Sequence, residues 1–134
     1  MSKLNKIALK ILSDGKGILA ADESNGTMTK RLESVNVPSN PENRLLFRET
    51  LFSSSGMKDF IGGVILYDET INQTSNLKQT IPELISKSGA VPGIKVDTGA
   101  KILAGSHEEK ITEGLDGLRE RLQNYYKLGA RFTK

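Results

Sequence analysis

Short apolar segments, each ending in charged or polar residues, recur along this 134-residue chain. The clearest covers residues 60–67 (FIGGVILY), a continuous run rich in β-branched residues that is typical of a strand covered on both faces. Similar runs cover residues 18–21 and 91–96, and residues 131–134 have the composition of a fourth strand's start. Helical patterns lie between them. This alternation predicts successive βα units around a parallel sheet, in the α/β class.

Three helices are expected before the second strand. Apolar side chains at helical spacing predict an amphipathic helix within residues 1–14, namely Leu4, Ile7, Ala8, Ile11 and Leu12. Thr27 is expected to cap the next helix. Asn40 and Pro41 predict the start of a helix over residues 41–52, because Asn40 accepts from free amides and Pro41 sacrifices no hydrogen bond.

Between the third and fourth strands the sequence predicts a loop and one long helix. Residues 99–106 form the expected loop, and His107 is expected to lie in solvent where the helix begins. Gly129 is expected to end the helix as a left-handed cap. The apolar face of this helix consists of Leu115, Leu118, Leu122 and Tyr125.

Length and composition limit the class of protein. A chain of 134 residues forms one domain or part of one, which we divide into an amino-terminal helix (1–14) and the first βα units (15–134). The 19 basic residues are interspersed with 16 acidic ones, a balance that argues against nucleic acid and suits an anionic small molecule. Without cysteine and with one histidine, no metal site and no cofactor are expected.

The amino-terminal helix also bears on location. Its lysines and apolar residues alternate at helical spacing, unlike the apolar core of a secretion signal. A mitochondrial transit peptide is an alternative, disfavoured because the segment has no arginine. We therefore expect a cytoplasmic protein that does not interact with a membrane.

Charged residues at the strand ends are the candidate catalytic groups. Asp22 follows the first strand, Lys95 and Asp97 end the third, and Lys134 ends the fourth. Carboxyl ends of parallel strands meet at one edge, so Asp22, Lys95 and Lys134 are expected to cluster there. One carboxylate beside two ammonium groups suits proton transfer or carbonyl chemistry. For Asp22, a structural role in capping a turn fits the pattern equally well.

Candidate phosphate-binding residues follow Asp22. Arg31 lies one helical turn beyond a loop with free amides and hydroxyls, which is suitable for binding phosphate, although a solvated helix face explains it as well. Arg44 also fits an ordinary surface position on its helix.

Five sequence blocks resemble class I fructose-bisphosphate aldolases in order and spacing: GKGILAADES, GGVILYDET, GIKVDTGA, EGLDGLRERLQNYY and GARFTK. The resemblance extends over essentially the whole chain. It implies a (βα)8 TIM barrel, of which this chain is about the first half, with strands 1–3 and the start of strand 4. It also implies a glycolytic lyase that cleaves fructose 1,6-bisphosphate through a lysine Schiff base without metal, and a homotetramer at full length.

The resemblance also implies roles for individual residues. Asp22 corresponds to an aspartate that assists proton transfer and carbon–carbon cleavage, and Lys95 and Lys134 to two lysines that polarise the substrate and stabilise negative charge. The implied substrate-binding or phosphate-binding residues are Ser24, Thr27, Arg31 and Arg44. Thr27 stands where many members have serine.

The family's Schiff-base lysine and glutamate acid/base lie beyond Lys134, so this chain alone is expected to be inactive, as a truncated or incompletely determined sequence. The alternative is a non-catalytic fragment or homologue that binds phosphosugars or protein partners. A different phosphate-handling barrel enzyme is disfavoured because several blocks match the aldolases together.

Overall fold

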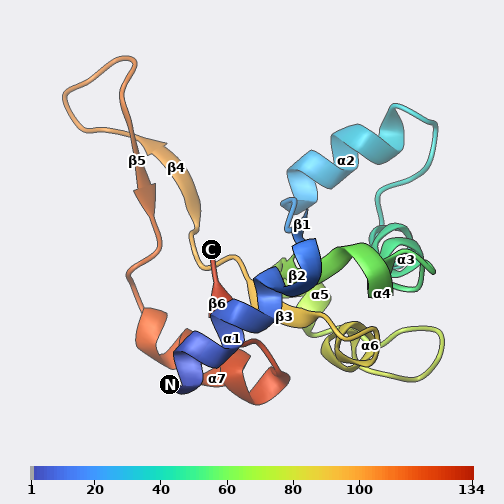
Figure 1. Cartoon of the computed structure of the whole chain (residues 1–134). Helices are drawn as coiled ribbons and strands as arrows, with labels where there is room; N and C mark the ends of the chain where they lie inside the picture. The colour runs from blue at the N-terminus through green and yellow to red at the C-terminus, as the bar shows by residue number, and fades with distance from the viewer. Residues whose placement is uncertain (1) are drawn as a thin grey trace.

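A curved four-stranded parallel sheet forms the centre of the computed structural model, which describes residues 2–134 (Figure 1). Its strand order is β1-β2-β3-β6, and each neighbouring pair is parallel. The strands are β1 (Gly17–Ala21), β2 (Ile61–Leu66), β3 (Val91–Ile94) and β6 (Phe132–Thr133). The prediction of four strands in a parallel α/β arrangement is therefore confirmed.

The helices lie between the strands in sequence, as the βα pattern predicts. They are α1 (Lys3–Leu12), the 3-10 turn η1 (Ser13–Gly15), α2 (Asn25–Glu33), α3 (Pro41–Phe52), α4 (Met57–Phe60), α5 (Asp68–Ile71), α6 (Ile81–Lys87) and α7 (Leu118–Leu128). The predicted helix over residues 41–52 is confirmed, and Asn40 accepts a hydrogen bond from the Asn43 amide at 2.8 Å.

The cap of α2 is Ser24, so the prediction that Thr27 caps this helix is wrong. Ser24 has an extended backbone, and its hydroxyl accepts from the Thr27 amide at 3.4 Å. Asn25 and Gly26 are typical turn residues but form the first two positions of α2. The helix is possible here because the Ser24 cap accepts hydrogen bonds from free backbone amides of its first turn.

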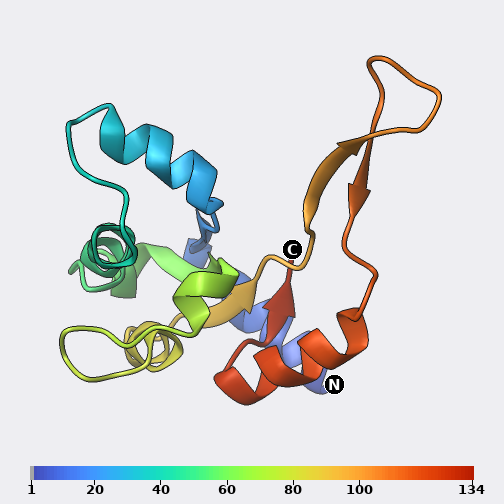
Figure 2. The same cartoon turned by 180° about the vertical axis from the view of Figure 1, so that it is seen from behind.

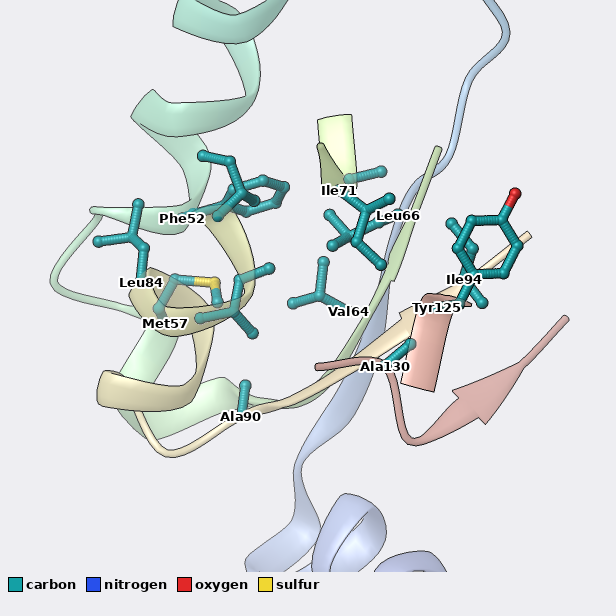
Figure 3. Packing of buried hydrophobic residues seen from close by; sticks show 13 residues of the cluster. Phe52, Met57, Val64, Leu66, Ile71, Leu84, Ala90, Ile94, Tyr125 and Ala130 are labelled. Atoms are coloured by element: carbon teal, nitrogen blue, oxygen red, sulfur yellow. The ribbon is translucent and has the colours of Figure 1, made fainter. Parts of the chain in front are cut away.

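A hydrophobic core fills the space between one face of the sheet and helices α3 to α7 (Figure 3). Alternate strand residues such as Val64, Leu66 and Ile94 point to this face and are fully buried. The side chains that the helices contribute include Phe52, Met57, Ile71, Ile81, Leu84, Ile85 and Tyr125.

The opposite, concave face of the sheet is closely covered at its amino-terminal end by α1. A Cβ atom placed on Gly62 of β2 would lie 1.9 Å from the carbonyl oxygen of Ile11 in α1. A Cβ on Gly93 of β3 would lie 2.4 Å from the Phe132 ring. These glycines therefore let α1 and Phe132 approach the sheet, and the carboxyl end of the concave face is left for polar residues.

An antiparallel hairpin replaces the loop and helix start that were predicted after the third strand. It consists of β4 (Gly99–Ile102) and β5 (Lys110–Glu113). Figures 1 and 2 show it projecting from the same end of the sheet as α2, with the chain's carboxyl terminus between them. Arg121 of α7 closes its base by donating to the Val96 carbonyl at 2.8 Å. His107 is exposed, as predicted.

The physical reason for this difference is non-local pairing combined with backbone breaks. Lys101 pairs with Ile111, a contact that helical periodicity does not register. Gly114 and Gly117 have φ angles of +147° and +60°, which prevents a helix from running through them. Leu115, predicted on the helix face, consequently precedes α7 and is 84% exposed.

Strand boundaries also differ from prediction. Phe60 ends the short helix α4 and is exposed, so β2 begins one residue later. The β3 strand ends at Ile94, yet the Lys95 amide still donates to the Leu66 carbonyl at 3.0 Å. The Val96 amide likewise donates to the Lys134 carbonyl at 3.2 Å, so residues 95–96 stay aligned with the sheet. Within residues 2–134, no helix combines the length and apolarity needed to span a membrane.

Candidate active site at the carboxyl end of the sheet

Asp22 and Lys134 directly follow the two outer strands of the sheet, β1 and β6, and nevertheless form an ion pair. Three strand spacings would separate β1 from β6 by about 14 Å in a flat sheet. Lys134 Nζ donates to Asp22 Oδ2 at 2.6 Å. The sheet is therefore curved like part of a barrel, and side chains on its concave face converge.

The environment of this pair is asymmetric. Asp22 is buried, with 6% of its surface exposed, whereas about half of the Lys134 side chain remains accessible. The hydrogen bond from Lys134 to Asp22 raises the pKa of the Lys134 ammonium above its ordinary value. Lys134 is consequently held in its protonated form at neutral pH.

Lys95 and Asp97 form a second ion pair beside the first. Lys95 Nζ donates to Asp97 Oδ1 at 2.6 Å and to the Asp97 carbonyl at 3.0 Å. The hydrogen bond from Lys95 lowers the pKa of the Asp97 carboxyl, and the charge of Asp97 also contributes to the raised pKa of Lys134. We call Asp22, Lys95, Asp97 and Lys134 the strand-end cluster.

The three predicted catalytic residues are thus brought together, with one addition. Asp97 was noted at a strand end but was not predicted as a site residue. The sequence did contain an indication that Asp97 belongs to the site. Residues two apart on an extended segment share a face, and Asp97 follows Lys95 by two. Its carboxylate is what places the Lys95 ammonium.

Ser24 caps α2, the helix that follows Asp22, and Thr27 and Arg31 lie on this helix. The Ser24 and Thr27 hydroxyl oxygens lie 3.2 Å apart at the amino-terminal end of the helix. Arg31 forms a salt bridge with Glu23, and 53% of its side chain is exposed. Substrate binding by these three residues stays a prediction, supported by their position next to the strand-end cluster.

Arg44 is engaged elsewhere. Its guanidinium makes a bidentate pair with Glu69, with Nε to Oε2 at 2.8 Å and Nη2 to Oε1 at 2.6 Å, and it also donates to Ser39. The Arg44 side chain is 9% exposed. In this structure Arg44 therefore joins α3 to α5 and has no hydrogen bond to the strand-end cluster. Its role in substrate binding stays a prediction.

Glu69 makes the stability of the fold depend on pH. The hydrogen bonds from Arg44 hold the pKa of Glu69 below its ordinary value. A carboxyl with a lowered pKa in the folded state stabilises above its unfolded pKa of about 4.3, and this contribution is lost as pH falls through the lowered value. The urea midpoint is therefore expected to fall between about pH 5 and pH 3, and Glu69→Gln is expected to reduce this slope. An identical slope in the variant would contradict the assignment.

Arg48 was missed by sequence reasoning, although it is the most deeply buried charged side chain among residues 2–134. An arginine in a polar helix usually indicates a solvated face. Helical spacing could have indicated its burial. Arg44, Arg48 and Phe52 follow one another at intervals of four residues, so they share a helix face, and Phe52 is a core residue. Within residues 2–134, no group of three histidine or acidic side chains is arranged to hold a metal ion.

A curved parallel sheet with ionisable side chains gathered at the carboxyl ends of its strands is characteristic of (βα)8-barrel enzymes. Comparison with known families identifies the particular one. The model of the class I fructose-bisphosphate aldolase family matches residues 3–134, and the chain belongs to that family.

Individual relatives agree with this assignment. A probable class 1 fructose-bisphosphate aldolase from Xylella fastidiosa is 48% identical over 134 residues, which are 100% of this chain and 40% of the relative. Fructose-bisphosphate aldolase 5, cytosolic, from Arabidopsis thaliana is 49% identical over 132 residues, which are 98% of this chain and 37% of the relative. The chain thus spans about 40% of the length of the curated relatives it matches.

A solved structure supports the fold at the same coverage. The chain resembles fructose-bisphosphate aldolase from Plasmodium falciparum, solved in a ternary complex with TRAP and a small-molecule inhibitor, with a TM-score of 0.92 and 44% sequence identity. The match covers 97% of this chain and 38% of the other. The fold is therefore that of the amino-terminal part of an aldolase.

Proposed function

We propose that this chain is the amino-terminal portion of an enzyme that cleaves fructose 1,6-bisphosphate to dihydroxyacetone phosphate and glyceraldehyde 3-phosphate. The observation that carries the proposal is the Asp22–Lys134 ion pair, which closes the concave face of the sheet at its carboxyl end. The strand-end cluster is then part of the reaction centre. Ser24, Thr27 and Arg31 bind substrate or phosphate beside it.

The charges of the cluster suit the cleavage of a carbon–carbon bond next to a carbonyl group. Ammonium groups held by carboxylates, as in Lys95 and Lys134, stabilise negative charge that develops on substrate oxygens. Asp22 is placed to accept a proton from a substrate hydroxyl when the bond breaks. The reaction also needs an amine nucleophile for the imine.

Neither lysine of the cluster suits the nucleophile's role. An imine forms from the free amine, and the raised pKa of Lys134 keeps it protonated. The Lys95 nitrogen donates to two oxygens of Asp97, and these contacts hold it away from attack on a carbonyl carbon. We therefore assign the Schiff-base lysine to the part of the enzyme that the relatives have beyond this chain's span.

Three further inferences concern the complete protein. We propose a homotetramer at full length and a substrate that is a phosphorylated sugar. The Arabidopsis relative is named cytosolic, which supports a cytoplasmic location. The alternative function is that of a non-catalytic protein that binds phosphosugars. It is favoured by Lys95 and Lys134, which can bind an anionic sugar although neither is assigned as the nucleophile.

Binding of fructose 1,6-bisphosphate to the 134-residue chain tests the proposed site. In an NMR titration, we expect amide shifts at Asp22, Lys95 and Lys134, and Lys134→Met is expected to weaken binding about tenfold, the equivalent of one lost charge-assisted contact. The control Lys127→Met, at an exposed lysine on α7, is expected to bind as the wild type does. Shifts confined to other surfaces would contradict the site.

Chemical trapping separates catalysis from binding. Borohydride reduction in the presence of dihydroxyacetone phosphate is expected to leave the chain unmodified, because Lys134 is held as an ammonium group and the Lys95 nitrogen is bound to Asp97. A covalent adduct on Lys95 or Lys134 would overturn the assignment of the nucleophile to a later segment. Trapping in a longer chain that continues like the relatives is the expected outcome for an aldolase, and its failure there would favour the binder.

A further inference from the structure

Arg48 is a fully buried charge that neither the catalytic nor the substrate-binding assignments use. It lies in the middle of α3, with 0% of its side chain exposed. Burying a guanidinium costs several kcal/mol unless hydrogen bonds replace the lost water. An apolar side chain would fill the same volume at lower cost, so the contacts of Arg48 indicate what the charge is for.

Those contacts lie on both sides of Asp22. Arg48 Nε donates to the carbonyl oxygen of Ala21 at 3.0 Å, and Nη2 donates to the carbonyl oxygen of Glu23 at 2.5 Å. The third nitrogen, Nη1, donates to Thr70 Oγ1 at 2.8 Å. The rigid planar fork of one guanidinium thus joins the residue before Asp22 to the residue after it.

The surroundings keep this guanidinium charged and in place. Burial lowers the pKa of Arg48, while the carboxylates of Glu23, 3.8 Å away, and Glu69 oppose that effect. The Tyr67 ring lies 5.9 Å from the guanidinium carbon. Because a guanidinium loses its proton only in strongly alkaline solution and two carboxylates oppose the effect of burial, the group stays protonated at neutral pH.

The segment that Arg48 holds is neither strand nor helix. The β1 strand ends at Ala21 and α2 begins at Asn25, so residues 22–24 connect two elements and lie outside both. The direction of the Asp22 carboxylate depends on the backbone of this connector. That carboxylate accepts the hydrogen bond of Lys134 at 2.6 Å.

We propose that Arg48 is a positioning residue for the Asp22–Lys134 pair, acting through the carbonyl groups on either side of Asp22. It does not reach the concave face itself. The inference concerns the proposed active site, but its test needs no substrate. The proposed function therefore survives if Arg48 fails this test, and Arg48 can pass it even if the chain binds no sugar phosphate.

The test follows the Lys134 ammonium by NMR in the 134-residue chain, through its side-chain carbon and nitrogen shifts across a pH titration. In Arg48→Lys, a single ammonium cannot bond both carbonyls in the guanidinium geometry. The pKa of Lys134 is expected to fall back toward its ordinary value. Amide exchange at Asp22 and Glu23 is expected to accelerate about tenfold or more, as for the loss of one or two hydrogen bonds.

Two controls distinguish positioning from general stability. Thr70→Val removes the Nη1 acceptor and leaves both carbonyl contacts, so it is expected to keep the Lys134 pKa. Ile85→Ala makes a cavity in the core away from the cluster, so it is expected to destabilise the fold without changing that pKa. The proposal is overturned if Arg48→Lys titrates like the wild type, or if Ile85→Ala shifts the Lys134 pKa equally.

Discussion

Replacing Gly62 with alanine is expected to destabilise the fold strongly, although the change adds only one methyl group. The added Cβ would lie 1.9 Å from the carbonyl oxygen of Ile11 and 2.8 Å from its carbonyl carbon. Both atoms belong to the backbone of α1, so no rotamer change relieves the overlap. Either α1 leaves the sheet or the strand shifts, at a cost of about 3 kcal/mol.

Urea unfolding and amide exchange measure the effect. Gly17→Ala is the matched control, because Gly17 is also a strand glycine and a Cβ there meets nothing within 4 Å. We expect the control to unfold at nearly the wild-type urea concentration, and Gly62→Ala to lose both stability and the protection of α1 amides. If Gly62→Ala matches Gly17→Ala, α1 does not pack against β2 as described.

The alternation of strands and helices was predictable because it depends on local pattern. Residues 60–67 are apolar without interruption, and in the structure β2 is the second of four strands, paired on both sides. Asn40 and Pro41 mark the start of α3 by a mechanism that acts within one turn. The curvature of the sheet was implied only by the family resemblance.

The hairpin was not predictable in the same way. Its strands are four residues each, and every residue of β5 is exposed. Its stability comes from pairing across the irregular connection formed by residues 103–109. Exposed short strands carry no apolar alternation, which is the signal that reveals most strands. Lys101 and Ile111 are opposite each other only because the chain turns back between them.

The residues of the candidate site were likewise predictable only where a local pattern indicates them. Asp22, Lys95 and Lys134 were predicted because parallel strands deliver their carboxyl ends to one edge. Arg48 was missed because its partners are backbone carbonyls, which have no sequence signature. Glu69 was missed because its bidentate contact joins it to Arg44, 25 residues earlier on another helix.

Replacing Arg44 with methionine is expected to destabilise the chain by about 2 kcal/mol at neutral pH. The change removes a bidentate pair and leaves the Glu69 carboxylate, with 21% of its side chain exposed, without its main partner. The difference from wild type is expected to shrink as pH falls below about 4, since the contribution of the pair is lost as Glu69 takes up a proton through its lowered pKa. Urea unfolding at pH 7 and pH 3.5 measures both effects.

Arg31→Met is the matched control, because Arg31 also pairs with a glutamate but 53% of its side chain is exposed. An exposed pair contributes less than about 1 kcal/mol, so the control is expected to remain close to wild type in stability. The two variants also separate the roles assigned to the two arginines. Arg31→Met is expected to weaken binding of fructose 1,6-bisphosphate while the fold persists. If Arg44→Met instead keeps its stability and loses sugar phosphate binding, Arg44 is a substrate contact and its pairing with Glu69 is secondary.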